Sequence, residues 1–191
     1  MNLLREKMFG GRTSPRIDAK GRMSLPVDIR GVLQYREELL AGAEVAETGK
    51  KKKAEAAAED QQLTVVMTCG LWTCHIDCYP IDEWRKMEKW IEGLPKNNET
   101  YEIKMHLVGN REYVDVDKLG RVLISPALRE YAGISAGQVV VMGTLETFGI
   151  WSAANYAATF TTKGKEKQVA ELIAKYEMKD QDKETKQDIP Q

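Results

Sequence analysis

The sequence predicts an α+β fold, mainly β with added helices, in which one short structural unit occurs twice. Three observations predict this fold. The phrase Asp-x-x-Gly-Arg occurs at residues 18–22 and again at residues 117–121. Each copy is followed by a short apolar run, a proline and a further arginine. Later strand-like segments also correspond, so we expect each unit to contain a hairpin, a helical turn and a pair of strands.

The repeat is supported by its constant spacing. Four identical residues recur 99 positions apart within the 13 positions of residues 18–30, where roughly one match is expected at typical residue frequencies. The pairs are Asp18/Asp117, Gly21/Gly120, Arg22/Arg121 and Arg30/Arg129. Downstream, the pair Tyr79 and Trp84 is mirrored by Trp151 and Tyr156, 72 positions later. The first copy therefore carries 99 − 72 = 27 additional residues.

Most of these additional residues lie in the segment 41–62. The segment is rich in Ala, Glu and Lys, includes four consecutive lysines at 50–53, and has few large apolar residues to bury. Such a composition favours helix but supplies no apolar stripe for packing. We expect an exposed insertion that is mobile or partly helical. Its lysines are interpreted as a solvated face rather than as phosphate contacts.

Each Asp-x-x-Gly-Arg phrase is typical of a tight turn that closes a β-hairpin. Asp is preferred at the first position of a type I turn, and Gly is preferred at the fourth. The flanking stretches Tyr113–Val116 and Arg121–Ile124 are short and contain β-branched residues, which strands favour. Pro26 and Pro126 then suit the first turn of a short helix.

The turn brings its first and fifth residues together, which gives the arginines two possible roles. Asp18 can hold Arg22, and Asp117 can hold Arg121. One interpretation is that each ion pair only pins its hairpin. The other is that a held guanidinium forms a fork ready for phosphate or for a guanine edge in a DNA groove. Repetition of the device favours the second interpretation.

Helices are expected between the two units and after them. The stretch 80–94 places Trp84, Met87 and Ile91 at helical spacing, and a second helix is expected over about Glu99–Leu107. Trp84 and Trp90 are interpreted as core or subunit-contact residues rather than base-stacking residues. The stretch 166–179 places four apolar residues on one helical face: Val169, Leu172, Ile173 and Tyr176.

These elements predict five segments along the chain. A first hairpin unit spans residues 8–80 with the exposed insertion inside it, and linking helices span 81–108. A second hairpin unit spans 109–156. A C-terminal helix covers 157–178, and a polar tail covers 179–191.

Composition and charge limit the functional classes to which this chain can belong. The net charge is −1, but residues 1–36 hold eight basic and three acidic side chains, so this end carries +5. A polarised charge of this kind suits a polyanionic partner. No apolar run approaches the roughly 20 residues that span a bilayer, and no signal peptide is visible. We therefore expect a cytoplasmic protein that does not enter a membrane.

The three cysteines offer a rival site. Cys69, Cys74, His75 and Cys78 are zinc-ligand types, but their spacing lacks the Cys-x-x-Cys of a zinc knuckle. In a strand, Cys74 and Cys78 would share one face while His75 takes the other. The same divergence opposes a Cys74 nucleophile with a His75 base. We expect thiols that pack in the core, and no metal, cofactor, small-molecule substrate or catalysis. His106 has no obvious partner.

An ordered set of motifs resembles the MraZ family, and it covers about Met8 to Tyr156. These motifs are MFGGRTSPRIDAKGRMSLPVDIR, CYPIDEW, LVGN, DVDKLGRVLISPALREYAGI and FGIW. The resemblance implies two tandem AbrB-like swapped-hairpin β units related by a pseudo-two-fold axis, with linking and C-terminal helices. It also implies a ring-shaped homo-oligomer that binds short direct repeats in the promoter of its own division and cell-wall operon.

The resemblance assigns DNA reading to the Asp-x-x-x-Arg motifs. The residues expected to contact double-stranded DNA are Lys20, Arg22, Lys118, Arg121, Arg12 and Arg16. Asp18 and Asp117 would orient the arginines, and Gly21 and Gly120 would form the turns. The function expected is sequence-specific transcriptional regulation on the nucleoid. Two alternatives stay open: a ring-forming scaffold, or an antitoxin that binds a toxin, through the helix near 169–176, as well as DNA.

Overall fold

The computed structural model describes residues 8–48, 63–160, 165 and 167–176. The first repeat contains β1 Arg12–Thr13, β2 Arg16–Ile17, β3 Arg22–Ser24, α1 Val27–Thr48, β4 Thr64–Cys69 and β5 Ile76–Pro80. The linking helices are α3 Ile81–Glu92 and α4 Asn98–Leu107. The second repeat contains β6 Glu112–Asp115, β7 Arg121–Leu123, α5 Pro126–Tyr131, β8 Gly137–Gly143, β9 Phe148–Ser152 and α6 Ala153–Thr159. A further helix covers residues 167–176.

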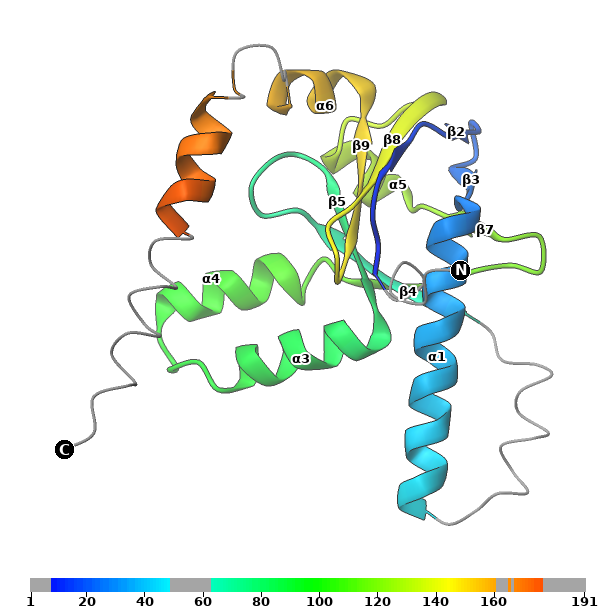
Figure 1. Ribbon diagram of the computed structural model, residues 1–191, viewed down its shortest axis with the longest axis vertical. Coiled ribbons are helices and arrows are strands. Elements are labelled where there is room, and N and C mark those ends of the chain that lie inside the picture. Colours follow the sequence, from blue (N-terminus) through cyan, green and yellow to red (C-terminus); the bar gives the residue numbers. More distant parts are fainter. Residues whose placement is uncertain (1–7, 49–62, 161–164, 166, 177–191) are drawn as a thin grey trace. The chain divides into compact units, whose positions relative to one another are not determined.

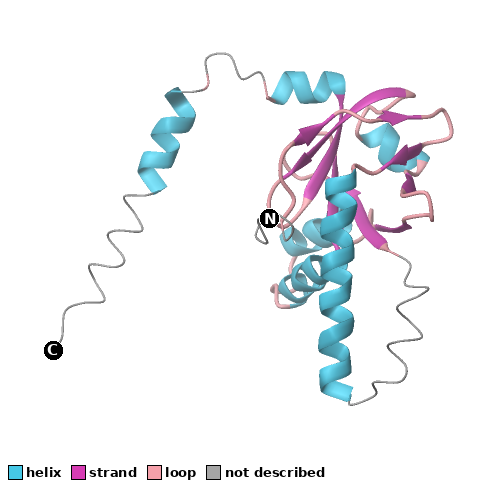
Figure 2. Cartoon of the chain, turned by 45° about the vertical axis from the view of Figure 1, so that its right-hand side comes forward, coloured by secondary structure: helices cyan, strands magenta, loops and turns pink. Residues whose placement is uncertain are grey.

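The two repeats exchange their hairpins. The strands gather into one body beside the helices (Figures 1 and 2). They form one sheet in the order β6-β4-β5-β9-β8-β2-β3-β7, with β1 added to β8. Strand β2 of the first repeat therefore pairs with β8 of the second, and β6 of the second pairs with β4 of the first. Strands β6 and β7, at the two ends of this order, lie in contact. The sheet is thus nearly closed, and each repeat supplies neighbouring strands to the other. This confirms the swapped-hairpin prediction.

The registers reveal the pseudo-two-fold axis. Met23 pairs with Val122, which is its own counterpart at the repeat spacing of 99. Asp77 pairs with Gly149, its counterpart at the downstream spacing of 72. A residue can face its own counterpart only where a two-fold axis passes between the two strands. The axis therefore passes through the β3–β7 pair and the β5–β9 pair.

The main core fills the inside of this sheet. Alternate residues of the short strands point inward, because side chains alternate across a strand. Met23, Val122, Ile124 and Ile150 are each no more than 1% exposed in this cluster. A second, smaller cluster lies under α3 and α4 and centres on Trp84, which is 1% exposed. The prediction of Trp84 as a core residue is confirmed.

The linking helices agree with the sequence. α3 follows Pro80, and its apolar side buries Trp84 and Ile91. α4 begins at a capping box, in which Asn97 accepts from the backbone N–H of Thr100 and Thr100 accepts from that of Asn97. The two helices run side by side next to the sheet (Figure 1). Pro126 occupies the first turn of α5, as predicted, and Ser125 caps that helix.

α1 is longer than predicted. The sequence predicts a short helical turn after Pro26, but the helix continues from Val27 to Thr48 into the insertion and runs past the strands (Figure 1). Arg36 anchors it to α3 through ion pairs with Asp82 and Glu83. Ala and Glu, which have high helix propensity, then carry the helix onward. The prediction of a partly helical insertion is confirmed over residues 41–48, and the lysines at 50–53 lie outside the described residues.

Residues 157–176 belong to a separate unit from residues 8–156. Within it, Val169, Leu172, Ile173 and Tyr176 lie on the helix 167–176 and are exposed. The expected polar tail at 179–191 falls outside the described residues. Across the described part of the chain, no helix combines the length and the apolar character that crossing a bilayer demands.

Candidate nucleic-acid interface

The first hairpin tip holds its arginine through one carboxylate. The chain turns back between β2 and β3, and Gly21 adopts φ 88° there. Asp18 Oδ1 accepts from the backbone N–H groups of Lys20 and Arg22, both at 2.9 Å. Asp18 Oδ2 accepts from Nε of Arg22 at 2.7 Å. The carboxylate thus fixes the turn with one oxygen and the guanidinium with the other.

The second tip repeats this geometry. Asp117 Oδ1 accepts from the backbone N–H groups of Leu119 and Arg121, both at 2.9 Å. Asp117 Oδ2 accepts from Nε of Arg121 at 2.7 Å, and Gly120 adopts φ 74°. The predicted pairing of first and fifth residues is therefore present in both turns.

These hydrogen bonds favour the ionised form of both aspartates. The backbone N–H of Arg22, followed by its guanidinium, lowers the pKa of Asp18 below its ordinary value. The guanidinium of Arg121, followed by its backbone N–H, does the same to the pKa of Asp117. A guanidinium has five N–H donors, and each ion pair uses only part of them. Both arginines therefore keep donors for an outside acceptor.

The two arginines stand on the same outer face of the sheet. Arg22 lies opposite Leu123, and Arg121 lies opposite Ser24, on either side of the inward-facing Met23–Val122 pair. Residues directly opposite each other project to the same face. The side chain of Arg22 is 48% exposed and that of Arg121 is 39% exposed. Neither is buried inside the protein.

An open groove of about 500 Å³ runs beside these arginines. Its lining residues come from both repeats: Arg16, Ile17, Asp18, Arg22, Ser24, Arg121, Ala136 and Gly137. Three of them are arginines, and Asp18 is the one acid among them. The groove can therefore attract an anionic ligand and present two oriented forks to it.

The other residues predicted to contact DNA lie in different parts of the fold. Lys20 and Lys118 are exposed at the two tips, and Arg16 lines the groove. Arg12 lies elsewhere, on β1, where its Nη1 donates to the hydroxyl of Tyr156 at 3.0 Å and its guanidinium lies 5.5 Å from that ring. The structure thus brings Arg16, Arg22 and Arg121 together and places Arg12 apart from them.

Backbone hydrogen bonds link the two tips, and two further arginines, which sequence reasoning missed, pack against the turns. The Gly21 carbonyl accepts from the N–H of Ile124, and the Gly120 carbonyl accepts from that of Leu25, both at 2.9 Å. A Cβ on Gly21 would lie 2.8 Å from Nε of Arg129, and one on Gly120 would lie 2.2 Å from Nη1 of Arg30. Each arginine therefore packs on the turn glycine of the other repeat. Their recurrence at the spacing of 99 was the available signal.

The cysteine-rich stretch is divided between strand and loop. Cys69 and Cys78 are buried thiols, as predicted, but Cys74 is exposed. The prediction that Cys74 packs in the core is wrong, because β5 starts only at Ile76 and Cys74 lies in the preceding loop. Within the part of the chain that the structure describes, no three His, Cys, Asp or Glu side chains are grouped as metal ligands would be.

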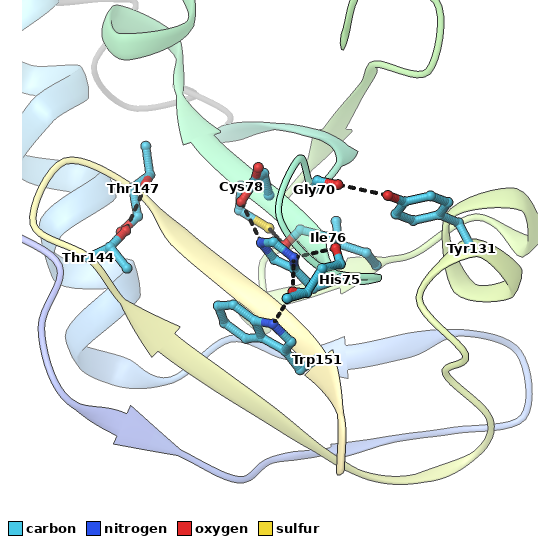
Figure 3. Close-up of polar contacts among 10 residues, drawn as sticks. Gly70, His75, Ile76, Cys78, Tyr131, Thr144, Thr147 and Trp151 are labelled. Carbon is cyan, nitrogen blue, oxygen red and sulfur yellow. Dashed lines mark hydrogen bonds and ion pairs between the residues drawn. The ribbon is translucent and has the colours of Figure 1, made fainter. Parts of the chain in front are cut away.

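His75 instead anchors the loop that precedes β5. Its ring stacks on Trp151 with centroids 4.5 Å apart (Figure 3). Nε2 lies 2.8 Å from Asp77 Oδ1, and Nδ1 lies 2.8 Å from the carbonyl oxygen of Thr73. The hydroxyl of Thr73 also lies 2.8 Å from Nδ1 and can donate to it, so these contacts are satisfied with or without a proton on Nδ1. Burial would lower the pKa of His75, but Asp77 and then the Thr73 carbonyl outweigh it and raise the pKa.

This raised pKa predicts a pH-dependent stability. Protonated His75 stabilises the fold fully below the pKa of an unfolded histidine, and the contribution disappears as the pH rises through the higher folded pKa. Urea unfolding of the wild type should show a free energy of unfolding that falls as the pH rises above about 6.5, the ordinary pKa of histidine. Asp77→Asn should flatten this dependence. Asp115→Asn, which alters an exposed carboxylate on β6, should leave it unchanged, and an equally steep fall in Asp77→Asn would contradict the assignment.

An apolar groove lies apart from the arginines. It has a volume of about 460 Å³ and is lined by Leu71, Tyr79, Glu83, Lys86, Met87, Trp90, Leu107 and Thr147. The neighbouring Trp72 is 90% exposed. Exposed apolar surface of this kind is typical of protein–protein contacts. This agrees with the interpretation of Trp90 as a subunit-contact residue.

Comparison with known proteins links this architecture to one family. Residues 107–176 match the family model described as "MraZ protein, putative antitoxin-like". A protein of Polaromonas sp. (strain JS666) named transcriptional regulator MraZ is 35% identical over 151 residues, which cover 79% of this chain and 87% of that protein. Proteins of the same name from Azotobacter vinelandii and Haemophilus influenzae (strain PittEE) are 31% and 30% identical, over 76% of this chain and 80% of each relative.

Proposed function

Since this chain belongs to the MraZ family of transcriptional regulators, we propose that it binds double-stranded DNA sequence-specifically through its two hairpin tips. One observation carries the proposal: two exposed guanidinium groups, each held by an aspartate, share one face beside a single arginine-lined groove. A guanidinium that an aspartate already holds loses little conformational entropy when it binds a ligand. Its planar N–H donors match the acceptors of guanine or of a phosphate group.

The contributions of the side chains differ in kind. Arg22 and Arg121 read base edges in the major groove, because their donors are oriented before DNA arrives. Lys20, Lys118 and Arg16 neutralise phosphate, which supplies affinity without sequence preference. Asp18 and Asp117 position the arginines, and Gly21 and Gly120 allow the turns. Arg12 is at most a peripheral contact, because Tyr156 already holds it.

The DNA target we propose is a set of short direct repeats in the promoter of the protein's own division and cell-wall operon. A single pair of tips spans little DNA, so each contact is weak. A ring of subunits on the nucleoid would present many tips and gain affinity by effective concentration. The apolar groove at Leu71 and Trp90, together with exposed Trp72, supports self-association.

A DNA titration tests this function. Labelled DNA from upstream of the gene and a scrambled duplex of the same composition are titrated at several salt concentrations, and sedimentation gives the mass of each complex. We expect preference for the upstream DNA, steep weakening with salt and a complex of several subunits. Equal binding to both duplexes would reject the regulator and favour a scaffold whose tips serve assembly.

Toxin binding remains a second candidate because of one observation. The helix 167–176 presents Val169, Leu172, Ile173 and Tyr176 exposed along one face, which suits a groove on a partner protein. The matching family model is also described as antitoxin-like. An antitoxin would keep its DNA binding when this helix is made polar, and would lose only its protein partner.

A further inference from the structure

The two hairpin tips have the same backbone but differ in one side chain. The third residue of the first tip is Lys20, and its counterpart 99 positions later is Leu119. Both donate a backbone N–H to the Oδ1 atom of the tip aspartate at 2.9 Å. The two side chains therefore leave the backbone at equivalent places. One tip offers an ammonium group there, and the other offers an isobutyl group.

Leu119 is strongly exposed, as Leu123 and Leu145 also are. It is 69% exposed, whereas the leucines of the two repeats that pack inward, such as Leu25 and Leu128, are 2% exposed. It contributes nothing to the core, because both buried clusters exclude it. An apolar side chain at the end of a turn is stabilising only if something covers it. A ligand that packs on this tip can supply that cover.

The surroundings of Leu119 restrict what can cover it. Lys118 precedes it, and Arg121 lies two residues beyond, on the face that also carries Arg22 and Arg16. Leu123, opposite Arg22, is also exposed on this face. A ligand that suits this surface is anionic and also offers small apolar groups. The major groove of DNA has this combination, since its phosphates are anionic and the 5-methyl group of thymine is its only apolar group.

We propose that Leu119 packs against the 5-methyl group of a thymine in the major groove and is a specificity-determining residue of the second tip. The inference rests on the proposed DNA-binding function. Arg121 then takes the acceptors of a neighbouring base, and Leu119 takes the methyl group beside it. Lys20, at the same place in the first tip, contributes attraction to phosphate instead. The two tips thus read DNA unequally despite their shared backbone.

Replacing thymine with deoxyuridine tests this contact, because it removes the methyl group and keeps every hydrogen-bonding atom. A duplex selected by the wild-type protein from a random-sequence pool is prepared in a thymine form and a deoxyuridine form. The wild type should bind the deoxyuridine form at least roughly fourfold more weakly, the ratio expected for one buried methyl group. Leu119→Ala should bind both forms with similar affinity and keep the wild-type salt dependence.

Two further variants sharpen the result. Leu119→Lys copies the first tip, so it should steepen the salt dependence and also abolish the discrimination between the two duplexes. Leu39→Ala removes a comparable leucine, 55% exposed on α1, and should discriminate as the wild type does. Combining the duplex and protein changes in one cycle isolates the interaction between the methyl group and Leu119.

The possible outcomes separate this inference from the function on which it rests. A wild type that prefers its selected sequence but binds both forms equally would overturn the role of Leu119 alone. Failure to select any sequence would overturn the proposed function itself. A Leu119→Ala protein whose sedimentation without DNA shows fewer subunits would assign Leu119 to a subunit interface, and would also overturn the inference.

Discussion

Replacing Arg22 with alanine is expected to weaken binding to the upstream DNA by roughly 5- to 150-fold for each bidentate interaction that the guanidinium makes, which corresponds to about 1–3 kcal/mol. The reason is geometric. Asp18 holds the guanidinium at the tip, so its free donors are already oriented toward a ligand. Alanine removes the fork and leaves the turn, since Asp18 also accepts from the backbone N–H of residues 20 and 22. Fluorescence anisotropy against upstream and scrambled duplexes measures the decrease in affinity.

Matched variants distinguish the effect of the planar guanidinium of Arg22 from the effect of its positive charge. Arg22→Lys keeps the positive charge but not the planar donors, so it should retain most of the salt dependence and lose the preference for the upstream sequence. Lys96→Ala removes an exposed cation between α3 and α4 and should change affinity little. Urea unfolding of Arg22→Ala should match the wild type. Wild-type affinity and sequence preference in Arg22→Ala would exclude the first tip as a DNA-reading element.

Local features of the fold were predictable from the sequence. The turn at each tip was predictable because the aspartate, the glycine and the arginine interact within five residues, and both turns form as expected. The helix over Ile81–Glu92 was predictable from the spacing of Trp84 and Ile91. The outer-face position of Arg22 follows from the same reasoning, because Met23 beside it is apolar and must face the core.

Nonlocal pairing was not predictable from residue patterns alone. That β2 joins β8, and β6 joins β4, depends on pairings between residues at least 45 positions apart, and only the family resemblance suggested it. The packing of Arg30 and Arg129 on the opposite turns follows from this exchange. The prediction for Cys74 is wrong for a different reason. It requires a strand that begins before Cys74, whereas β5 begins at Ile76. The preceding loop ends at His75, which contacts Trp151 and Asp77.

The exchange also explains why the candidate site is a property of both repeats together. Each turn is closed by its own aspartate, but it is held in place by a strand and an arginine of the other repeat. The groove takes Arg16 and Arg22 from the first repeat and Arg121 from the second. A change at one turn glycine should therefore disturb the fold of both repeats.

Replacing Gly21 with alanine is accordingly expected to lower the free energy of unfolding by roughly 2–4 kcal/mol, from backbone strain and overpacking combined. Gly21 has φ 88°, which a residue with a Cβ rarely adopts. That Cβ would also lie 2.5 Å from the carbonyl oxygen of Ile124, the backbone of the opposite strand. The oxygen cannot rotate away, so the β3–β7 pair at the pseudo-two-fold axis must separate. Urea unfolding at a fixed protein concentration measures the change.

Two other glycines provide controls. In Gly120→Ala the strain is similar, at φ 74°, but the nearest atom is Nη1 of the Arg30 side chain, which can rotate away. The decrease in its free energy of unfolding should therefore be smaller, about 1–3 kcal/mol. Gly31 lies in α1 with nothing within 4 Å of its added Cβ. Gly31→Ala should stabilise the protein by about 0.5–1 kcal/mol, because alanine favours helix. If Gly21→Ala were no more destabilising than Gly120→Ala, the Ile124 backbone would not be the rigid barrier that distinguishes the two turns.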